Sequence, residues 1–217
     1  MMMCERANVF MDCGSAMQSC IKEISTMRMY ITRHGQTDWN IDHRLQGRTD
    51  IPLNALGRAQ AVTCGEALRG AGIELIITSP LSRAYETAKI VRGYIGDVPI
   101  VCDELLVERS FGQLEGQCMY VSEAESRETE FEVEPREKAY ERIRSAVENY
   151  RENYPDKTIL VVTHGGVLFE LLCGVMGERL NMRPSELKNA GINCIEYKER
   201  PVVTRFNLSK DEFLAVD

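Results

Sequence analysis

Short apolar runs alternate with longer segments of helical periodicity along this chain. The apolar runs lie at 29–32, 75–78, 99–102 and 159–163, with a final pair at 192–197 and 202–206. Apolar residues recur at helical spacing over 54–70, from 79, over 135–154 and from 165 onward. Continuous apolar runs are typical of parallel strands that helices cover on both faces. The pattern therefore predicts an α/β fold, a three-layer α/β/α sandwich with a mostly parallel central sheet.

Chain length and local composition indicate one domain with an N-terminal extension. A chain of 217 residues with a hydrophobic fraction of 44% can form one α/β domain with a sizeable core. Residues 1–26 are rich in methionine and cysteine, show no clear amphipathic period, and precede the first strong strand. We expect a domain over 27–217 and a poorly ordered extension over 1–26.

Charge and cysteine usage exclude several classes of partner. The net charge of −7 gives no general attraction to nucleic acid or to an anionic membrane surface, so neither is expected to bind. The sequence has no long uncharged apolar run and no basic-then-apolar signal segment. Single cysteines scattered through apolar segments are typical of reduced, buried thiols, and they predict a cytoplasmic protein; they are Cys64, Cys102, Cys118, Cys173 and Cys194.

Two histidines follow directly after apolar runs. Arg33 and His34 end the first run, and Gly35 allows the chain to turn sharply there. His164 ends the strongest run and precedes a helix, whose N-terminus favours an anion. The carboxyl ends of parallel strands form the crevice in which ligands bind. A lone Arg-His-Gly can also be an ordinary strand end with a surface arginine, so other residues must decide.

Arg83 and Glu108 extend this group of candidates. Arg83 lies in the first turn of a predicted helix, where a cation is disfavoured unless an anion binds. The alternative is an exposed Arg83 that pairs with Glu86. Glu108 lies in the loop after the run at 99–102. Together with the strand-end residues these side chains predict a cationic pocket in an otherwise acidic protein, and its expected guest is a phosphoryl group.

Such a group of residues suits phosphoryl transfer, which depends mainly on positioning and on stabilising the charge of the phosphoryl oxygens. A histidine can accept the phosphoryl group as a nucleophile. A protonated Glu108 can protonate the leaving oxygen and then deprotonate the attacking water. The hypothesis is covalent catalysis through a phosphohistidine.

In five ordered motifs the sequence resembles the histidine phosphatase superfamily, in its phosphoglycerate mutase-like branch. The motifs lie at 33–40, 44–53, 79–88, 108–116 and 163–166. The resemblance implies that His34 is the phosphorylated nucleophile and Glu108 the proton donor. It further implies that Arg33, Arg83 and His164 bind the phosphoryl oxygens, and it implies no metal and no other cofactor.

The same resemblance points to residues that line the substrate pocket. These are Thr37, Asn40, Gln46, Gly47, Arg109 and Gly165. For Thr37 and Asn40 the alternative is local capping of the turn after Gly35.

The segment after the motif at 108–116 helps to distinguish a phosphatase from a mutase. Mutases of this family carry extra basic residues there to hold a bisphosphorylated intermediate. Here residues 117–134 are acidic and contain Arg127 as their one basic residue. Like charge would weaken retention of a polyanion, so we expect a phosphatase that acts on a small phosphorylated metabolite. The acidic run itself is expected to be a solvated face.

Several alternatives stay open at this stage. A phosphoglycerate mutase is the second interpretation, and an α-ribazole phosphatase or a broad-specificity phosphatase are candidates for the substrate. A non-catalytic binder of phosphorylated ligands could keep the arginines without His34 or Glu108. A metal hydrolase could use His34, Asp38 and His164 as ligands. The oligomeric state is open, with a homodimer as one candidate.

Overall fold

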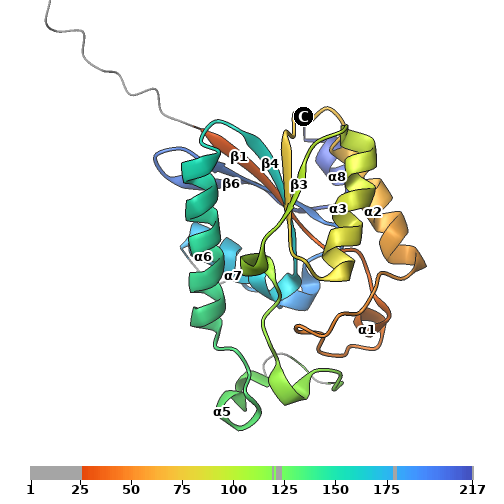
Figure 1. The fold of residues 1–217 in the computed structure, drawn as a ribbon, viewed down its shortest axis with the longest axis vertical. Coiled ribbons are helices and arrows are strands. Elements are labelled where there is room, and N and C mark those ends of the chain that lie inside the picture. The colour runs from red at the N-terminus through yellow and green to blue at the C-terminus, as the bar shows by residue number, and fades with distance from the viewer. Residues whose placement is uncertain (1–25, 119, 121–123, 178–179, 217) are drawn as a thin grey trace, which may run out of the picture.

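The computed structural model has a central sheet that contains six of the described strands, in the order β3-β2-β4-β1-β5-β6 (Figure 1). The structure describes residues 26–118, 120, 124–177 and 180–216. The strands are β1 Met27–Arg33, β2 Leu75–Thr78, β3 Ile100–Cys102, β4 Thr158–Thr163, β5 Ile192–Tyr197 and β6 Pro201–Leu208. β1 to β4 pair in parallel, whereas β5 and β6 pair antiparallel at one side. The predicted, mostly parallel sheet is confirmed.

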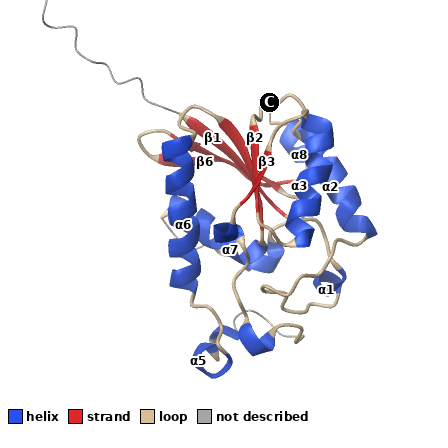
Figure 2. Cartoon of the chain, in the orientation of Figure 1, coloured by secondary structure: helices blue, strands red, loops and turns tan. Residues whose placement is uncertain are grey.

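Helices cover both faces of this sheet, as the apolar runs predicted (Figure 2). In β1, Met29 and Ile31 pack into the core beneath α6 Arg136–Asn153 and α7 Gly165–Met176. Tyr30 between them packs on the other face. There the helices α2 Ala55–Ala67, α3 Ser82–Ile95 and α8 Lys210–Leu214 complete a second core. The three-layer α/β/α architecture is therefore confirmed.

The helices begin where local sequence signals place them. The Asn54 side chain accepts a hydrogen bond from the Gly57 amide at 2.8 Å and caps α2. Pro135 directly precedes α6, and Gly177, at a φ of 71°, ends α7. Three short helices were not predicted: α1 Asp38–Ile41, α5 Glu128–Phe131 and α8. Their few residues carry too little periodicity for a sequence pattern to reveal them.

The parallel register brings three strand ends together. Arg33 pairs with Thr163 across β1 and β4, and Thr78 pairs with Val162 across β2 and β4. The chain therefore leaves these neighbouring strands at the same edge, immediately before His34, Ser79 and His164. This edge is the ligand-binding edge of an open α/β sheet.

Two expectations about surface and burial were wrong in part. Cys64 and Cys194 are buried, but Cys102 and Cys118 are exposed. In the acidic segment, the side chain of Glu134 is only 9% exposed and Glu125 only 22%, because both carboxylates pair with arginines. The described part of this segment is therefore more than a solvated face, because Glu125, Glu128 and Glu134 pair with arginines.

The expected N-terminal extension over 1–26 lies outside the described residues apart from Thr26, so it stays a prediction. In the described part of the chain, no helix is both long and apolar enough to span a membrane.

Candidate active site

His34 lies at the end of β1 with its ring almost completely buried. Its Nδ1 lies 2.6 Å from the carbonyl oxygen of Gly35. A carbonyl can only accept, so Nδ1 carries the proton of the neutral ring and Nε2 has a free lone pair. Burial, and then the positive charges of Arg83 and Arg33, hold the pKa of His34 well below 6.5. The ring is thus a neutral imidazole that can act as a nucleophile.

His164 faces His34 from the beginning of α7. The centroids of the two rings are 5.2 Å apart and their planes are inclined by 59°. Burial, followed by the positive charge of Arg83, keeps the pKa of His164 well below 6.5 as well. Its Nε2 lies 2.8 Å from Ser79 Oγ, which also accepts a hydrogen bond from the Leu81 amide. The Ser79 hydroxyl can therefore donate to Nε2, which leaves the ring proton on Nδ1.

The two arginines of the site are buried without a carboxylate partner. Arg83 is completely buried and donates to the carbonyl oxygens of Gly47 and Thr49 at 2.8 and 2.9 Å. Arg33 donates to the carbonyl oxygen of Leu187 at 2.8 Å. Burial lowers the pKa of Arg33, and it lowers that of Arg83 to about 10. Within the described residues, no carboxylate lies in ion-pair distance of either guanidinium.

The sequence alternative for Arg83 is wrong. Glu86 pairs instead with Arg58, whose Nε lies 2.6 Å from a Glu86 carboxylate oxygen. Arg83 points inward because the loop over 46–49 supplies two carbonyl acceptors close to the sheet edge.

Glu108 supplies the negative charge of the site. Its Oε2 accepts from the Gly166 amide at 2.9 Å, and its Oε1 accepts from the amides of Val167 and Arg109 at 3.1 and 2.9 Å. The carboxylate therefore lies at the N-terminus of α7, where the helix dipole favours an anion. It is close enough to the two buried arginines to raise the pKa of each. All five predicted catalytic residues are brought together.

Three buried nitrogens of this site have no hydrogen-bond partner among the described residues. They are Arg33 Nε, Arg83 Nε and His164 Nδ1. A buried donor without an acceptor costs about 1–3 kcal/mol, so such groups indicate a missing partner. A tetrahedral oxyanion offers several acceptor oxygens in a small volume, and it also neutralises two buried cations. The geometry favours a phosphate-like group.

Comparison with known proteins agrees with this chemistry. The family model described as histidine phosphatase superfamily (branch 1) matches residues 29–209. The chain belongs to the histidine phosphatase superfamily.

Relatives of this histidine phosphatase include both phosphatases and mutase-like proteins. The "uncharacterized phosphatase PhoE" of Bacillus subtilis is 36% identical over 172 residues, which cover 78% of this chain and 88% of that protein. "Phosphoglycerate mutase-like protein 4" of Arabidopsis thaliana is 31% identical over 69% of this chain and 71% of that protein. A solved mycobacterial glucosyl-3-phosphoglycerate phosphatase, in complex with VO3, superimposes with a TM-score of 0.72 at 28% identity, over 84% of this chain and 99% of that one. An enzyme of the phosphatase and mutase type is thereby supported.

The predicted substrate-pocket residues of this histidine phosphatase fall into two groups. Gln46, Gly47 and Gly165 lie at the site: Gly47 holds Arg83, a Cβ on Gly165 would lie 3.2 Å from Arg33 Nε, and Gln46 Oε1 is buried without a partner among the described residues. Thr37 and Asn40 cap α1, since Asn40 Oδ1 accepts from the Thr37 amide at 3.0 Å, and Asn40 Oδ1 also lies 3.5 Å from Nδ2 of Asn189. The local capping of the turn is confirmed, and a role of these two residues in the substrate pocket stays a prediction.

The guanidinium of Arg109 does not join the catalytic group. It lies 2.7 Å from a carboxylate oxygen of Glu125 and donates to the carbonyl oxygen of Glu134 at 2.8 Å. Only its backbone amide reaches Glu108. Arg109 thus fixes the acidic segment to the loop that carries Glu108.

Other contacts of the site were not assigned from the sequence. Glu115 accepts from the amides of Arg48 and Thr49 at 3.0 and 2.8 Å and so holds the loop that binds Arg83. Asn189 donates to the carbonyl oxygen of His34 at 2.9 Å. Glu115 stands within a recognised motif, which could have signalled a role, whereas no local pattern distinguishes Asn189.

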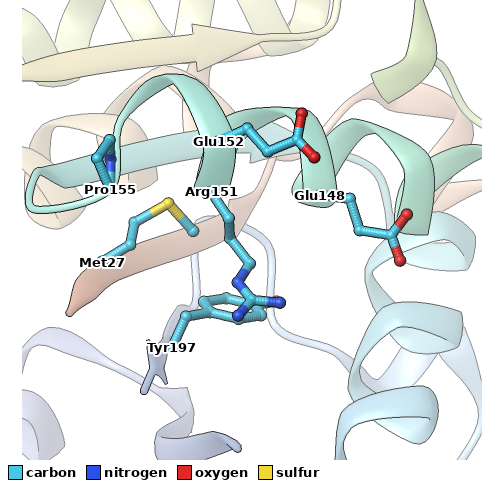
Figure 3. A pocket seen from close by; sticks show the side chains of 6 residues that line it. All are labelled: Met27, Glu148, Arg151, Glu152, Pro155 and Tyr197. Atoms are coloured by element: carbon cyan, nitrogen blue, oxygen red, sulfur yellow. The ribbon is translucent and has the colours of Figure 1, made fainter. Parts of the chain in front are cut away.

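In the described part of the chain, neither a metal site nor a second cleft belongs to the group of residues at the strand ends. Among the described residues no three His, Cys, Asp or Glu side chains are grouped to hold a metal ion, so His34, Asp38 and His164 do not form such a set. A separate cleft of about 380 Å³ lies beside the first residue of β1 (Figure 3). There Arg151 lies over the ring of Tyr197, 5.3 Å from its centroid. At about 3.3 Å per residue, the length of β1 separates this cleft from Arg33 by about 20 Å.

Proposed function

We propose that this protein is a phosphatase that hydrolyses a small phosphomonoester through a phosphohistidine on His34. The observation that carries the proposal is the neutral His34 ring beside three buried nitrogens that lack acceptors among the described residues. Arg33, Arg83 and His164 are buried, and they donate to the phosphoryl oxygens and stabilise the charge there. No metal ion and no other cofactor takes part.

In the first half-reaction, His34 Nε2 attacks phosphorus and the bond from phosphorus to the ester oxygen breaks. The Glu108 carboxylate first takes up a proton as the substrate binds and then gives that proton to the departing oxygen, so an alcohol leaves. The Nδ1–H donated to the Gly35 carbonyl stabilises the positive charge that the ring acquires. In the second half-reaction, water attacks phosphorus and gives a proton to Glu108. The phosphorus–nitrogen bond then breaks, and inorganic phosphate and neutral His34 result.

The described part of the acidic segment supports hydrolysis over mutase activity. A mutase must retain a second phosphoryl group, which needs free cations near the pocket. Arg127, the one basic residue of 117–134, pairs with Glu130 at 3.2 Å, and Arg109 is neutralised by Glu125. Neither arginine is available for a second phosphate. A mutase is the second candidate because a relative is named phosphoglycerate mutase-like.

The substrate is proposed as a class, a small phosphorylated metabolite in the cytoplasm. An α-ribazole phosphate is one candidate within this class. A solved chain described as a putative α-ribazole-5'-P phosphatase from Escherichia coli shares 25% of its residues with this one.

A steady-state assay in EDTA separates these functions. The purified protein receives p-nitrophenyl phosphate, or 3-phosphoglycerate with and without 2,3-bisphosphoglycerate, and both inorganic phosphate and 2-phosphoglycerate are recorded. We expect free phosphate without isomerisation. The variant His34→Asn should lose at least about a hundredfold in activity, whereas the matched variant of the exposed His43, His43→Asn, should keep it. Formation of 2-phosphoglycerate that depends on bisphosphoglycerate would refute the phosphatase, and loss of activity in EDTA would refute metal independence.

A further inference from the structure

Arg142 of α6 binds the backbone that carries Glu108. Its Nη1 donates to the carbonyl oxygens of Leu105 and Val107 at 2.6 and 2.7 Å, and its Nη2 lies 3.5 Å from that of Glu108. The side chain is only 13% exposed. A single guanidinium therefore contacts the backbone of the proposed proton donor and of two residues that precede it.

The other edge of the same guanidinium is fixed by Glu134. Nε and Nη2 of Arg142 each lie 3.3 Å from one of the two Glu134 carboxylate oxygens. This bidentate pair orients the plane of the guanidinium. A lysine offers one ammonium without the planar fork and cannot hold both sets of acceptors in this way.

A second contact from α6 holds the beginning of the same loop. Tyr150 donates to a carboxylate oxygen of Asp103 at 2.5 Å, and the other oxygen of Asp103 caps the 3-10 helix Glu104–Leu106. The backbone from 103 to 108 is thus anchored to one rigid helix at both ends. The carboxylate of Glu108 is in turn held by the amides of α7.

We propose that Arg142 is a positioning residue that places the Glu108 carboxyl group for proton transfer. The inference rests on the proposed function, because it gives Arg142 a role in the step that Glu108 performs. Among the described residues, Arg142 forms hydrogen bonds only with the backbone of this loop and with Glu134, so we infer that it acts through Glu108 and does not itself bind the phosphoryl group.

This role can be separated from a general contribution to the fold. Protonation by Glu108 matters most when the leaving group is a poor one, such as an aliphatic alkoxide, and least for p-nitrophenolate. A misplaced Glu108 should therefore lower kcat/KM more for an alkyl phosphate than for p-nitrophenyl phosphate. Partial unfolding would lower both values by the same factor.

The test compares Arg142→Lys and Arg142→Met with the matched changes at Arg144. Arg144 lies on the same helix and is exposed, and its one ion pair among the described residues is with Glu148. With glycerol 2-phosphate we expect the Arg142 variants to lose about tenfold or more in kcat/KM, since small misplacements of a catalytic group are costly. With p-nitrophenyl phosphate the loss should be at least about threefold smaller. Arg144→Lys and Arg144→Met should match the wild type with both substrates.

A double-mutant cycle completes the test. If Arg142 acts through Glu108, Arg142→Lys should reduce kcat/KM by less than about twofold in a Glu108→Gln background. The proposal would be overturned if the Arg142 variants lost kcat/KM equally for both substrates, or if their loss were fully additive with that of Glu108→Gln. It would also be overturned if both Arg142 variants failed to fold. If instead the wild type has no phosphatase activity, or if Glu108→Gln leaves it unchanged, it is the proposed function that fails.

Discussion

Two buried arginines in this protein differ in whether a carboxylate pairs with them. Arg83 is 0% exposed and Arg109 is 2% exposed, so both guanidinium groups are removed from water. Arg109 lies 2.7 Å from a carboxylate oxygen of Glu125 and 3.5 Å from one of Glu128. Arg83 donates to two carbonyl oxygens, and its Nε has no partner among the described residues.

This difference in ion pairing indicates the role of each arginine. A buried cation that carboxylates neutralise needs no further anion, and it holds the segment that supplies those carboxylates in place. A buried cation without an ion-pair partner keeps part of its desolvation cost until an anion arrives. Arg83 and the neighbouring Arg33 thus form a site prepared for an anion, whereas Arg109 holds the acidic segment in place.

Replacement of Arg83 should therefore affect catalysis most. Arg83→Met removes a donor to the charge that develops on the phosphoryl oxygens, so kcat/KM should fall by about 10²–10³-fold. Its free energy of unfolding should change by less than about 1.5 kcal/mol, because loss of two carbonyl contacts is offset by removal of an unpaired buried charge. Kinetics and urea unfolding measure the two quantities. A variant as active as the wild type would contradict the contrast.

Replacement of Arg109 should lower the stability of the protein more than its activity. Arg109→Met leaves the carboxylates of Glu125 and Glu128 without their buried partner, which should cost about 3 kcal/mol in the free energy of unfolding. Activity of the folded variant should fall far less than that of Arg83→Met. Urea unfolding in parallel with an assay at low temperature checks both expectations; a stability equal to that of the wild type would show that the ion pairs are dispensable.

The two histidines should make stability depend on pH. Burial holds the pKa values of His34 and His164 well below 6.5 in the folded protein, whereas in the unfolded chain each histidine binds a proton near pH 6.5. The unfolded state therefore binds more protons, so stability is highest above pH 6.5 and falls as the pH drops below it. Each histidine should cost about 1.4 kcal/mol between about pH 7.5 and 5.5. Replacement His164→Asn should remove about half of this dependence, and an unchanged slope would contradict the assignment.

An oxyanion should stabilise the wild type and fail to stabilise the Arg83 variant. Orthovanadate at about ten times its dissociation constant should add about 1.4 kcal/mol to the free energy of unfolding. The same addition should have no effect on Arg83→Met and should still stabilise Arg109→Met. Calorimetry with each protein makes the comparison, and equal stabilisation of all three would place the anion elsewhere.

The sequence predicted the framework of this protein and the residues at its strand ends. Apolar runs over 75–78 and 159–163 report burial on both faces, and such runs locate β2 and β4 almost to the residue. His34 and His164 directly follow strands, so the parallel topology alone is enough to bring them together.

The partners of the charged residues could not be predicted in this way. Some charged residues contact partners that are far away in the sequence, and such contacts leave no periodic signal there. Examples are the contacts of Arg109, Arg142 and Glu115. The acidic segment was expected to be solvated because local composition does not reveal that Arg109 and Arg136 lie beneath it. Burial of a charge depends on the tertiary fold, and here only the structure shows it.

The central claim is that His34 carries the phosphoryl group during turnover, and a quenched-flow experiment tests it directly. Enzyme and p-nitrophenyl phosphate are mixed, stopped in alkali to preserve a phosphoramidate, and analysed by intact mass and peptide mapping. We expect one phosphoryl group, on His34, that appears before steady state and accumulates further in Glu108→Gln. Turnover without any phosphorylated protein, or phosphorylation at a residue other than His34, would contradict it.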